Sequence, residues 1–149
     1  MRYYSSVLGR TVLDTDVLVA AVRSDRGASR VLLVAALEQR YAILASVPLM
    51  IEYESVLTRP EHLDAAGISA TDIGRVLDAL ASVVEPIRIS YLWRPMLPDA
   101  GDDLVLETAV NGHADVLITF NRRDFGPSAR FGIEILSPGD AVRRLEGHA

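Results

Sequence analysis

The chain has 149 residues, of which 50% are hydrophobic and 23% charged, as in folded globular domains. We expect one domain over residues 1–149, because this length suffices to bury one core. The formal net charge of −5 excludes a protein that coats nucleic acid with a basic surface, but it allows a local basic rim.

Three further features of the composition predict a cytoplasmic protein with no membrane contact. The chain has no cysteine, which excludes disulfides and thiolate metal sites. Its first ten residues lack the pattern of a signal peptide. No apolar run approaches the ~18 residues that a membrane helix needs.

Short apolar segments alternate with helical patterns, as is typical of βαβ units around a parallel sheet. Residues 10–14 predict a buried strand that ends at Asp14, and a helix is expected to begin near Val17. The next helix is predicted over residues 27–40 and the second strand over residues 41–46.

The rest of the chain continues this alternation. Pro48 fits the first turn of a helix that ends at Arg59 and Pro60, and Ser69 with Asp72 predicts a capping box for a helix over residues 69–85. The remaining predicted elements are a strand, a helix and two strands over residues 87–90, 101–112, 115–120 and 131–136. This order predicts an α/β fold, a three-layer α/β/α sandwich with a central, mostly parallel sheet.

Two carboxylates, Asp14 and Asp16, lie one residue apart in the otherwise apolar segment "TVLDTDVLV". Ligands of open parallel sheets bind beyond the carboxyl ends of the strands, and Asp14 lies at such an end. Aspartate is also a favoured helix cap, so either residue could instead start the following helix. Both interpretations remain open for these two residues alone.

Acidic residues on two predicted helices support the binding interpretation. Glu52 lies at the margin of the apolar stripe of its helix, whereas Glu54 points the opposite way. In the helix over residues 101–112, Asp102 projects near the middle of the expected buried face and Asp103 at its edge. That buried face is defined by Leu106, Ala109 and Val110, and the expected solvent-facing residues are Glu107, Thr108 and Asn111. A buried carboxylate requires a cation or a donor beside it.

These acidic residues come from separate helix and strand ends, and no histidine cluster accompanies them. Such an all-oxygen ligand set suits Mg²⁺ or Mn²⁺. Mg²⁺ held by a few carboxylates usually keeps several waters and contacts substrate phosphates. The pattern therefore indicates phosphodiester chemistry.

The sequence resembles the PIN-domain ribonucleases, in particular the VapC-like toxins of bacterial toxin–antitoxin pairs. The matching segments, in order, are "VLDTDVLVAAV", "RGASRVLL", "SVPLMIEYESVLTRP" and "DAGDDLVLETAVNGHADVLITFNRRDF", followed by the closing strand. The resemblance implies an Mg²⁺- or Mn²⁺-dependent endoribonuclease that hydrolyses RNA phosphodiester bonds and leaves a 5′ phosphate and a 3′ hydroxyl. It also implies a cognate antitoxin protein as partner.

The resemblance also implies roles for individual residues. The metal ligands would be Asp14, Glu52 and either Asp102 or Asp103, with Asp102 favoured by its spacing within the motif. Thr119 would orient the attacking water or a carboxylate.

Two positions depart from the family pattern. Asp16 stands where the family usually has Asn, which adds a negative charge near the metal. Asn121 replaces the acid of the family's Thr-x-Asp motif. Asn121 could still orient water or bind through its carbonyl oxygen, and Asp124 is a candidate to supply the missing charge.

All 15 basic residues are arginine, and five of them follow predicted elements near the acidic centre. Guanidinium groups bind phosphates bidentately, so RNA phosphate contacts are expected from this set, namely Arg23, Arg26, Arg30, Arg122 and Arg123. The alternative for each is a solvated surface arginine. The helices between Pro48 and Glu85 are either the surface of an expected homodimer or part of the core.

Two other function classes remain open. A haloacid-dehalogenase-like phosphatase fits Asp14, Asp16 and the later "GDD", but it normally uses a lysine and this chain has none. A catalytically inactive PIN domain that acts as a binding module is supported by Asn121.

Overall fold

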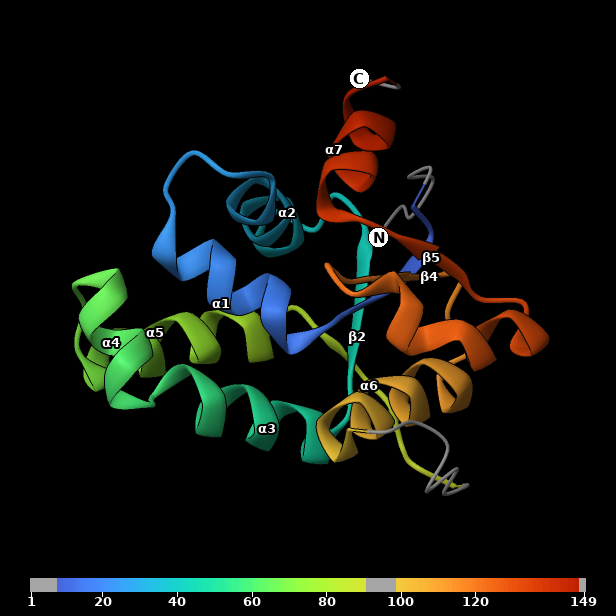
Figure 1. Cartoon of the computed structure of the whole chain (residues 1–149), viewed down its shortest axis with the longest axis horizontal. Helices are drawn as coiled ribbons and strands as arrows, with labels where there is room; N and C mark the ends of the chain where they lie inside the picture. Colours follow the sequence, from blue (N-terminus) through green and yellow to red (C-terminus); the bar gives the residue numbers. More distant parts are fainter. Residues whose placement is uncertain (1–7, 91–98, 148–149) are drawn as a thin grey trace.

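The strands form one parallel sheet with helices on both faces (Figure 1). The computed structural model describes residues 8–90 and 99–147. The strand order is β3-β2-β1-β4-β5, with β1 (Arg10–Leu13), β2 (Ala42–Ala45), β3 (Glu85–Pro86), β4 (Val116–Ile118) and β5 (Glu134–Leu136). Every neighbouring pair is parallel. The predicted three-layer α/β sandwich is confirmed.

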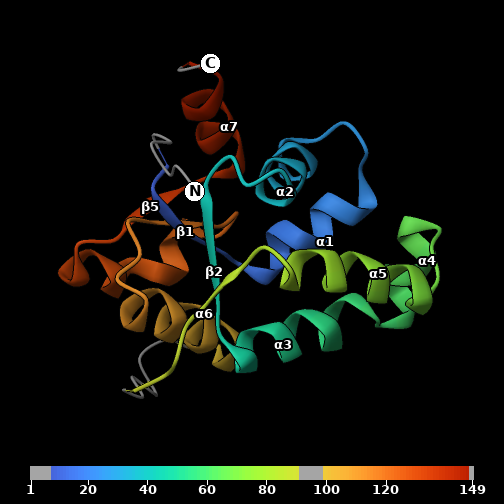
Figure 2. The ribbon, with the colours of Figure 1, turned by 180° about the vertical axis from the view of Figure 1, so that it is seen from behind.

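The helices connect these strands and form the outer layers. They are α1 (Thr15–Arg23), α2 (Ala28–Leu37), α3 (Val47–Leu57), α4 (Pro60–Ala66), α5 (Ala70–Ala81), α6 (Ala100–Asn111), the 3-10 segment η1 (Arg122–Phe131) and α7 (Pro138–Glu146). α2 packs on α7, and α6 packs on β1 and β2 from the opposite side of the sheet (Figures 1 and 2). Within the two described ranges, no helix is long and apolar enough to cross a membrane.

The starts of α3 and α5 follow from local side chains. The Ser46 hydroxyl accepts a hydrogen bond from the Leu49 N–H at 3.2 Å, and Pro48 lies in the first turn, where a missing N–H costs nothing. At the start of α5, Ser69 and Asp72 each accept the other's backbone N–H at 3.1 Å. The predicted capping box is confirmed.

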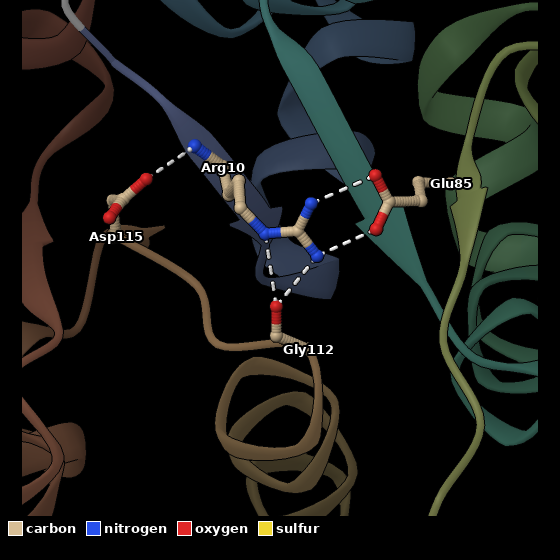
Figure 3. Close-up of polar contacts among 4 residues, drawn as sticks. All are labelled: Arg10, Glu85, Gly112 and Asp115. Atoms are coloured by element: carbon tan, nitrogen blue, oxygen red, sulfur yellow. Dashed lines mark hydrogen bonds and ion pairs between the residues drawn. The ribbon is translucent and has the colours of Figure 1, made fainter.

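Arg10 links three elements at the end of the sheet where β1 begins (Figure 3). Its guanidinium donates to both carboxylate oxygens of Glu85 in β3, at 2.8 and 2.6 Å. It also donates to the carbonyl of Gly112, the C-terminal cap of α6, at 3.1 and 2.7 Å. A cation at a helix C-terminus is electrostatically favourable, so this contact fixes α6 against the sheet.

One expected strand is absent, and three elements, α4, η1 and α7, were not predicted. The strand predicted over residues 87–90 is absent from the described structure, because the chain turns toward α6, where the Ser90 N–H donates to Asn111 Oδ1 at 2.9 Å. Pro60 begins α4 as well as ending the preceding helix, since proline fits the first helical turn. Neither η1 nor α7 was predicted.

Candidate functional site

The carboxyl ends of β1 and β4 bring Asp14 and Thr119 together. The two strands are neighbours, with Leu13 paired to Ile118, and Asp14 and Thr119 are the next residues on each. The Thr119 hydroxyl donates to Asp14 Oδ2 at 2.7 Å, and both side chains are buried. The chain leaves β1 toward β2 on one side and later returns to β4 on the other, which is the switch point where open α/β sheets bind ligands.

Asp14 also caps α1, because its Oδ1 accepts the Thr15 N–H at 2.8 Å. The capping interpretation is therefore confirmed, but the cap uses only one of the two carboxylate oxygens, Oδ1. The pKa of Asp14 is raised from 3.8 to about 7, first by burial and then by the nearby charge of Asp16, although the bonds from Thr119 and Thr15 act to lower it. A carboxylate in this environment is stabilised by a nearby cation.

Helix α3 brings a second carboxylate to this point. The buried Tyr53 hydroxyl donates to the carbonyl of Leu13 at 2.5 Å, which holds α3 against the end of β1. The neighbouring Glu52 is half-buried and faces a hollow of about 320 Å³. We call this the acidic hollow, and its acidic and amide residues are Asp14, Asp16, Glu52, Asp99, Asp102 and Asn121.

Helix α6 contributes Asp102 to the acidic hollow, while Asp103 does not line it. The burial of this pair reverses the helical-wheel expectation, since Asp103 is 3% exposed and Asp102 is half-buried. Glu107 and Thr108, expected to face solvent, are also buried. The reason is that α6 packs against β1 and β2, α3 and η1, so its apolar stripe does not define its only buried face.

Asp102 lies among like charges. Its pKa is raised from 3.8 to about 7, first by burial and then by the charges of Asp14, Asp99, Asp124 and Asp103, in decreasing order. Asp124 is exposed and does not line the acidic hollow, although its charge acts on Asp102. The negative charge of this region is therefore concentrated and only weakly compensated.

Asp16 and Asn121 contact each other across the acidic hollow. Asp16 Oδ2 accepts the Asn121 Nδ2–H and the Phe120 backbone N–H, both at 3.3 Å. The Asn121 backbone N–H donates to the Thr119 hydroxyl oxygen at 3.0 Å. Asp16 Oδ1 is buried and has no hydrogen-bond partner in the described part of the chain, and burial raises the pKa of this carboxyl.

Two cationic or potentially cationic residues in the acidic hollow were missed by the sequence analysis. Arg59, which precedes α4, and His62, in its first turn, line the hollow together with Glu52. His62 Nδ1 is buried without a partner among residues 8–90 and 99–147. Their position depends on α4, which the sequence pattern did not predict.

The five arginines expected to contact RNA have different environments. Arg23 lies beside Asp16 and Phe120 in a second hollow that adjoins the acidic one. The Arg30 guanidinium donates to the Ala21 carbonyl at 2.6 Å and joins α2 to α1. Arg122 lies 3.9 Å from Asp140, and the remaining two, Arg26 and Arg123, are exposed.

The chemistry of the acidic hollow fits a divalent cation. Carboxylate oxygens are the preferred ligands of Mg²⁺ and Mn²⁺, and the unpartnered Asp16 Oδ1 and the raised pKa values of Asp14 and Asp102 mark negative charge that a cation would neutralise. No three acidic or histidine side chains of the described residues are already arranged in ligating geometry. Side chains would have to move to bind the ion.

Residues 10–123 match the sequence model of the PIN domain. The chain belongs to the PIN domain family. Twelve chains of solved structures match this PIN domain. One is in the crystal structure of VapBC2 from Rickettsia felis bound to a DNA fragment from their promoter, with a TM-score of 0.56 over 86% of this chain and 98% of that chain. At 16% identity this similarity shows a shared fold. No curated protein sequence matches significantly.

Proposed function

We propose that this PIN domain is a divalent-metal-dependent endoribonuclease that hydrolyses RNA phosphodiester bonds. The observation that carries the proposal is the acidic hollow, where Asp14, Glu52 and Asp102 converge from a strand end and two helices. Nucleases that use Mg²⁺ or Mn²⁺ need such a set of hard oxygen ligands beside a space for the phosphate. Membership of the PIN domain family supports the same chemistry.

In this proposal Asp14, Glu52 and Asp102 hold the metal. A bound Mg²⁺ or Mn²⁺ lowers the pKa of a coordinated water and offsets the charge that develops on the phosphate. Asp103 is buried outside the acidic hollow, so its burial supports a packing role. Thr119 holds the Asp14 carboxylate through its 2.7 Å hydrogen bond and fixes the direction of Oδ2.

The substrate phosphates would meet Arg59 and His62. Both residues line the acidic hollow and offer nitrogen donors to an anion. His62 Nδ1 has no hydrogen-bond partner among the described residues. Asp16 supplies the negative charge that Asn121 lacks, because the two side chains are one hydrogen bond apart.

Two alternatives compete with this proposal. Membership of the PIN domain family leaves the phosphatase interpretation without support, and the chain lacks the lysine that such phosphatases normally use. An inactive PIN domain that only binds a partner is favoured by one observation, the lack of preformed metal geometry among the described side chains. A metal titration separates this alternative from the nuclease.

The test is cleavage of single-stranded RNA with Mg²⁺ or Mn²⁺ and with EDTA. We expect cleavage only with metal, and Asp14→Asn and Glu52→Gln should lower the rate by at least about 100-fold, because loss of a ligand exceeds the 10- to 100-fold effect of an outer partner. Glu54→Gln is the matched control, since Glu54 lies on the same helix but outside the acidic hollow. Equal cleavage in EDTA, or an equal loss with Glu54→Gln, would contradict the proposal.

We also propose that the protein is the toxin of a toxin–antitoxin pair and acts in the cytoplasm. The similarity in fold to VapBC2 supports an antitoxin partner. A homodimer is a separate proposal, supported by the exposed Val47 and Ile51 side chains of α3 beside an apolar hollow of about 340 Å³. An adjacent gene for a small DNA-binding protein would support the first, and the molar mass in solution tests the second.

A further inference from the structure

Phe120 exposes an aromatic ring beside the acidic hollow. Its side chain is 54% exposed, and among the large apolar side chains exposed in the described structure it alone is aromatic. It stands between Thr119 and Asn121, two residues of the proposed catalytic site. An exposed aromatic ring at this place offers a flat apolar face to a ligand of the acidic hollow.

The backbone around this ring is held in place. The Phe120 N–H donates to Asp16 Oδ2 at 3.3 Å, and the Thr119 N–H donates to the Leu136 carbonyl at 3.0 Å. The next residue, Asn121, donates its N–H to the Thr119 hydroxyl at 3.0 Å. The exposed ring therefore stands on a fixed segment just beyond the carboxyl end of β4.

The ring forms one wall of a second hollow, of about 400 Å³, which we call the aromatic hollow. It is lined by Asp16, Val19, Ala20, Arg23, Ser24 and Phe120. Asp16 and Val19 line both hollows, so the two adjoin. A ligand that reaches the acidic hollow can thus extend over Phe120.

Arg23 gives the aromatic hollow a positive charge. It lies in the last turn of α1, is exposed, and makes no ion pair with any residue in the two described ranges. A flat aromatic surface with a guanidinium beside it matches a nucleotide, whose base stacks on rings and whose phosphate binds arginine.

We propose that the aromatic hollow binds one unpaired base of the RNA next to the scissile phosphate, with Phe120 stacking on the base and Arg23 contacting the adjoining phosphate. This inference rests on the proposed nuclease function, because the acidic hollow would hold the scissile bond. Bases of a duplex already stack on their neighbours, so the site selects single strands, loops or ends. An apolar segment of a protein partner is the competing occupant of the same ring.

The test uses a short single-stranded RNA that carries 2-aminopurine, titrated into the protein in EDTA. Stacking quenches 2-aminopurine fluorescence, so we expect quenching with the wild type and its loss with Phe120→Leu, which keeps an apolar side chain. The affinity of Phe120→Leu should fall about 10-fold, as for one stacked base. Phe120→Tyr should retain both the quenching and the affinity. Arg23→Gln should weaken RNA binding and reduce its salt dependence, while some quenching remains.

Two matched controls lie away from both hollows. Val34→Ala removes another exposed apolar side chain, and Arg40→Gln removes another exposed arginine. Both should bind the RNA as the wild type does. Equal quenching by the wild type and Phe120→Leu would overturn the proposal and assign Phe120 to a protein-binding surface, and an absence of quenching with the wild type would overturn it as well.

The two proposals fail in different ways. Metal-dependent cleavage without quenching at Phe120 would reject only the base site. Quenching that depends on Phe120, without cleavage in any metal, would reject the nuclease function and keep the base site.

Discussion

At the scale of single residues, the pair of Asp16 and Asn121 carries the departure from the family pattern. The resemblance implies an amide at the first position and an acid at the second, and this chain has the reverse order. The two side chains are joined at 3.3 Å from Asn121 Nδ2 to Asp16 Oδ2. The number of carboxylates in the acidic hollow is therefore preserved although their positions are exchanged.

Asn121→Asp should destabilise the metal-free protein by about 1 kcal/mol, because a hydrogen bond is replaced by repulsion between two carboxylates. The same change should tighten Mn²⁺ binding. The double variant Asp16→Asn with Asn121→Asp should regain the wild-type stability, since the amide–carboxylate pair is restored in reverse. Melting in EDTA and Mn²⁺ titration of the three proteins measure both effects.

If the two substitutions lower the stability of the double variant additively, the interchange of the amide and the carboxylate is contradicted. If Asn121→Asp leaves the Mn²⁺ affinity unchanged, residue 121 lies outside the metal's ligands. Asp124, whose charge acts on Asp102, would then be the next acid to replace.

The sequence analysis located the acidic residues but not the contacts that position them. Asp14 was found at a strand end, Glu52 at a stripe margin and Asp102 by its spacing in the family motif, and all three line one hollow. The bond from the Tyr53 hydroxyl to Leu13 joins residues 40 positions apart, which no local pattern reveals. The wheel analysis was wrong for Asp103 because it assumed one buried face for a helix that packs on several elements.

At the scale of elements, the close approach of α3 to the start of α6 depends on Gly101. A Cβ atom at this position would lie 3.1 Å from Glu52 Oε2 and 3.1 Å from Asp99 Oδ1. Such a contact is tight, so the ends of the Glu52 and Asp99 side chains would have to shift to accommodate a Cβ atom. Gly101 therefore leaves room for the Glu52 carboxylate against the backbone of α6.

Gly101→Ala should weaken Mn²⁺ binding and slow RNA cleavage about 10-fold, because the displaced Glu52 carboxylate is a proposed ligand. Alanine also favours helix by about 1 kcal/mol over glycine, so the fold should not be lost. Gly74→Ala in α5 is the control, since its added Cβ meets no atom within 4 Å. It should stabilise the protein without changing metal affinity, and an equal effect of both variants on Mn²⁺ would contradict the role of Gly101.

Element prediction succeeded where a buried apolar run or a side-chain cap marked the segment. β1, β2 and β4 are short buried runs, and α5 begins with its capping box. α7 begins with Ser137 bonded to the Asp140 N–H and with Pro138 in the first turn, the same arrangement as at α3, and this signal was overlooked. β3 has only two residues, and its place is fixed by Arg10, which is distant in sequence.

At the scale of the whole molecule, the acidic hollow makes folding and metal binding interdependent. The pKa values of Asp14 and Asp102 rise from 3.8 to about 7 in the folded chain, mainly by burial. Between pH 3.8 and about pH 7, these two carboxyl groups therefore bind protons more tightly in the folded state than in the unfolded chain. Below pH 4 this contribution to stability is fully present, and it is lost as the pH rises through 7.

The free energy of unfolding in EDTA should consequently fall from pH 5 to pH 8, and Asp102→Asn should reduce this fall by about 1 kcal/mol. The figure is smaller than the full pKa shift would give, because solvent screens a half-exposed carboxylate. Mn²⁺ competes with protons for the same carboxylates, so adding it should raise stability more at pH 8 than at pH 5.

Asp72→Asn is the control: the pKa of Asp72 is lowered by its bonds to Ser69, so it is charged in both states throughout this range. Denaturant unfolding at both pH values, with and without Mn²⁺, measures these changes, and a wild-type slope that Asp102→Asn leaves unaltered would place the titrating group elsewhere.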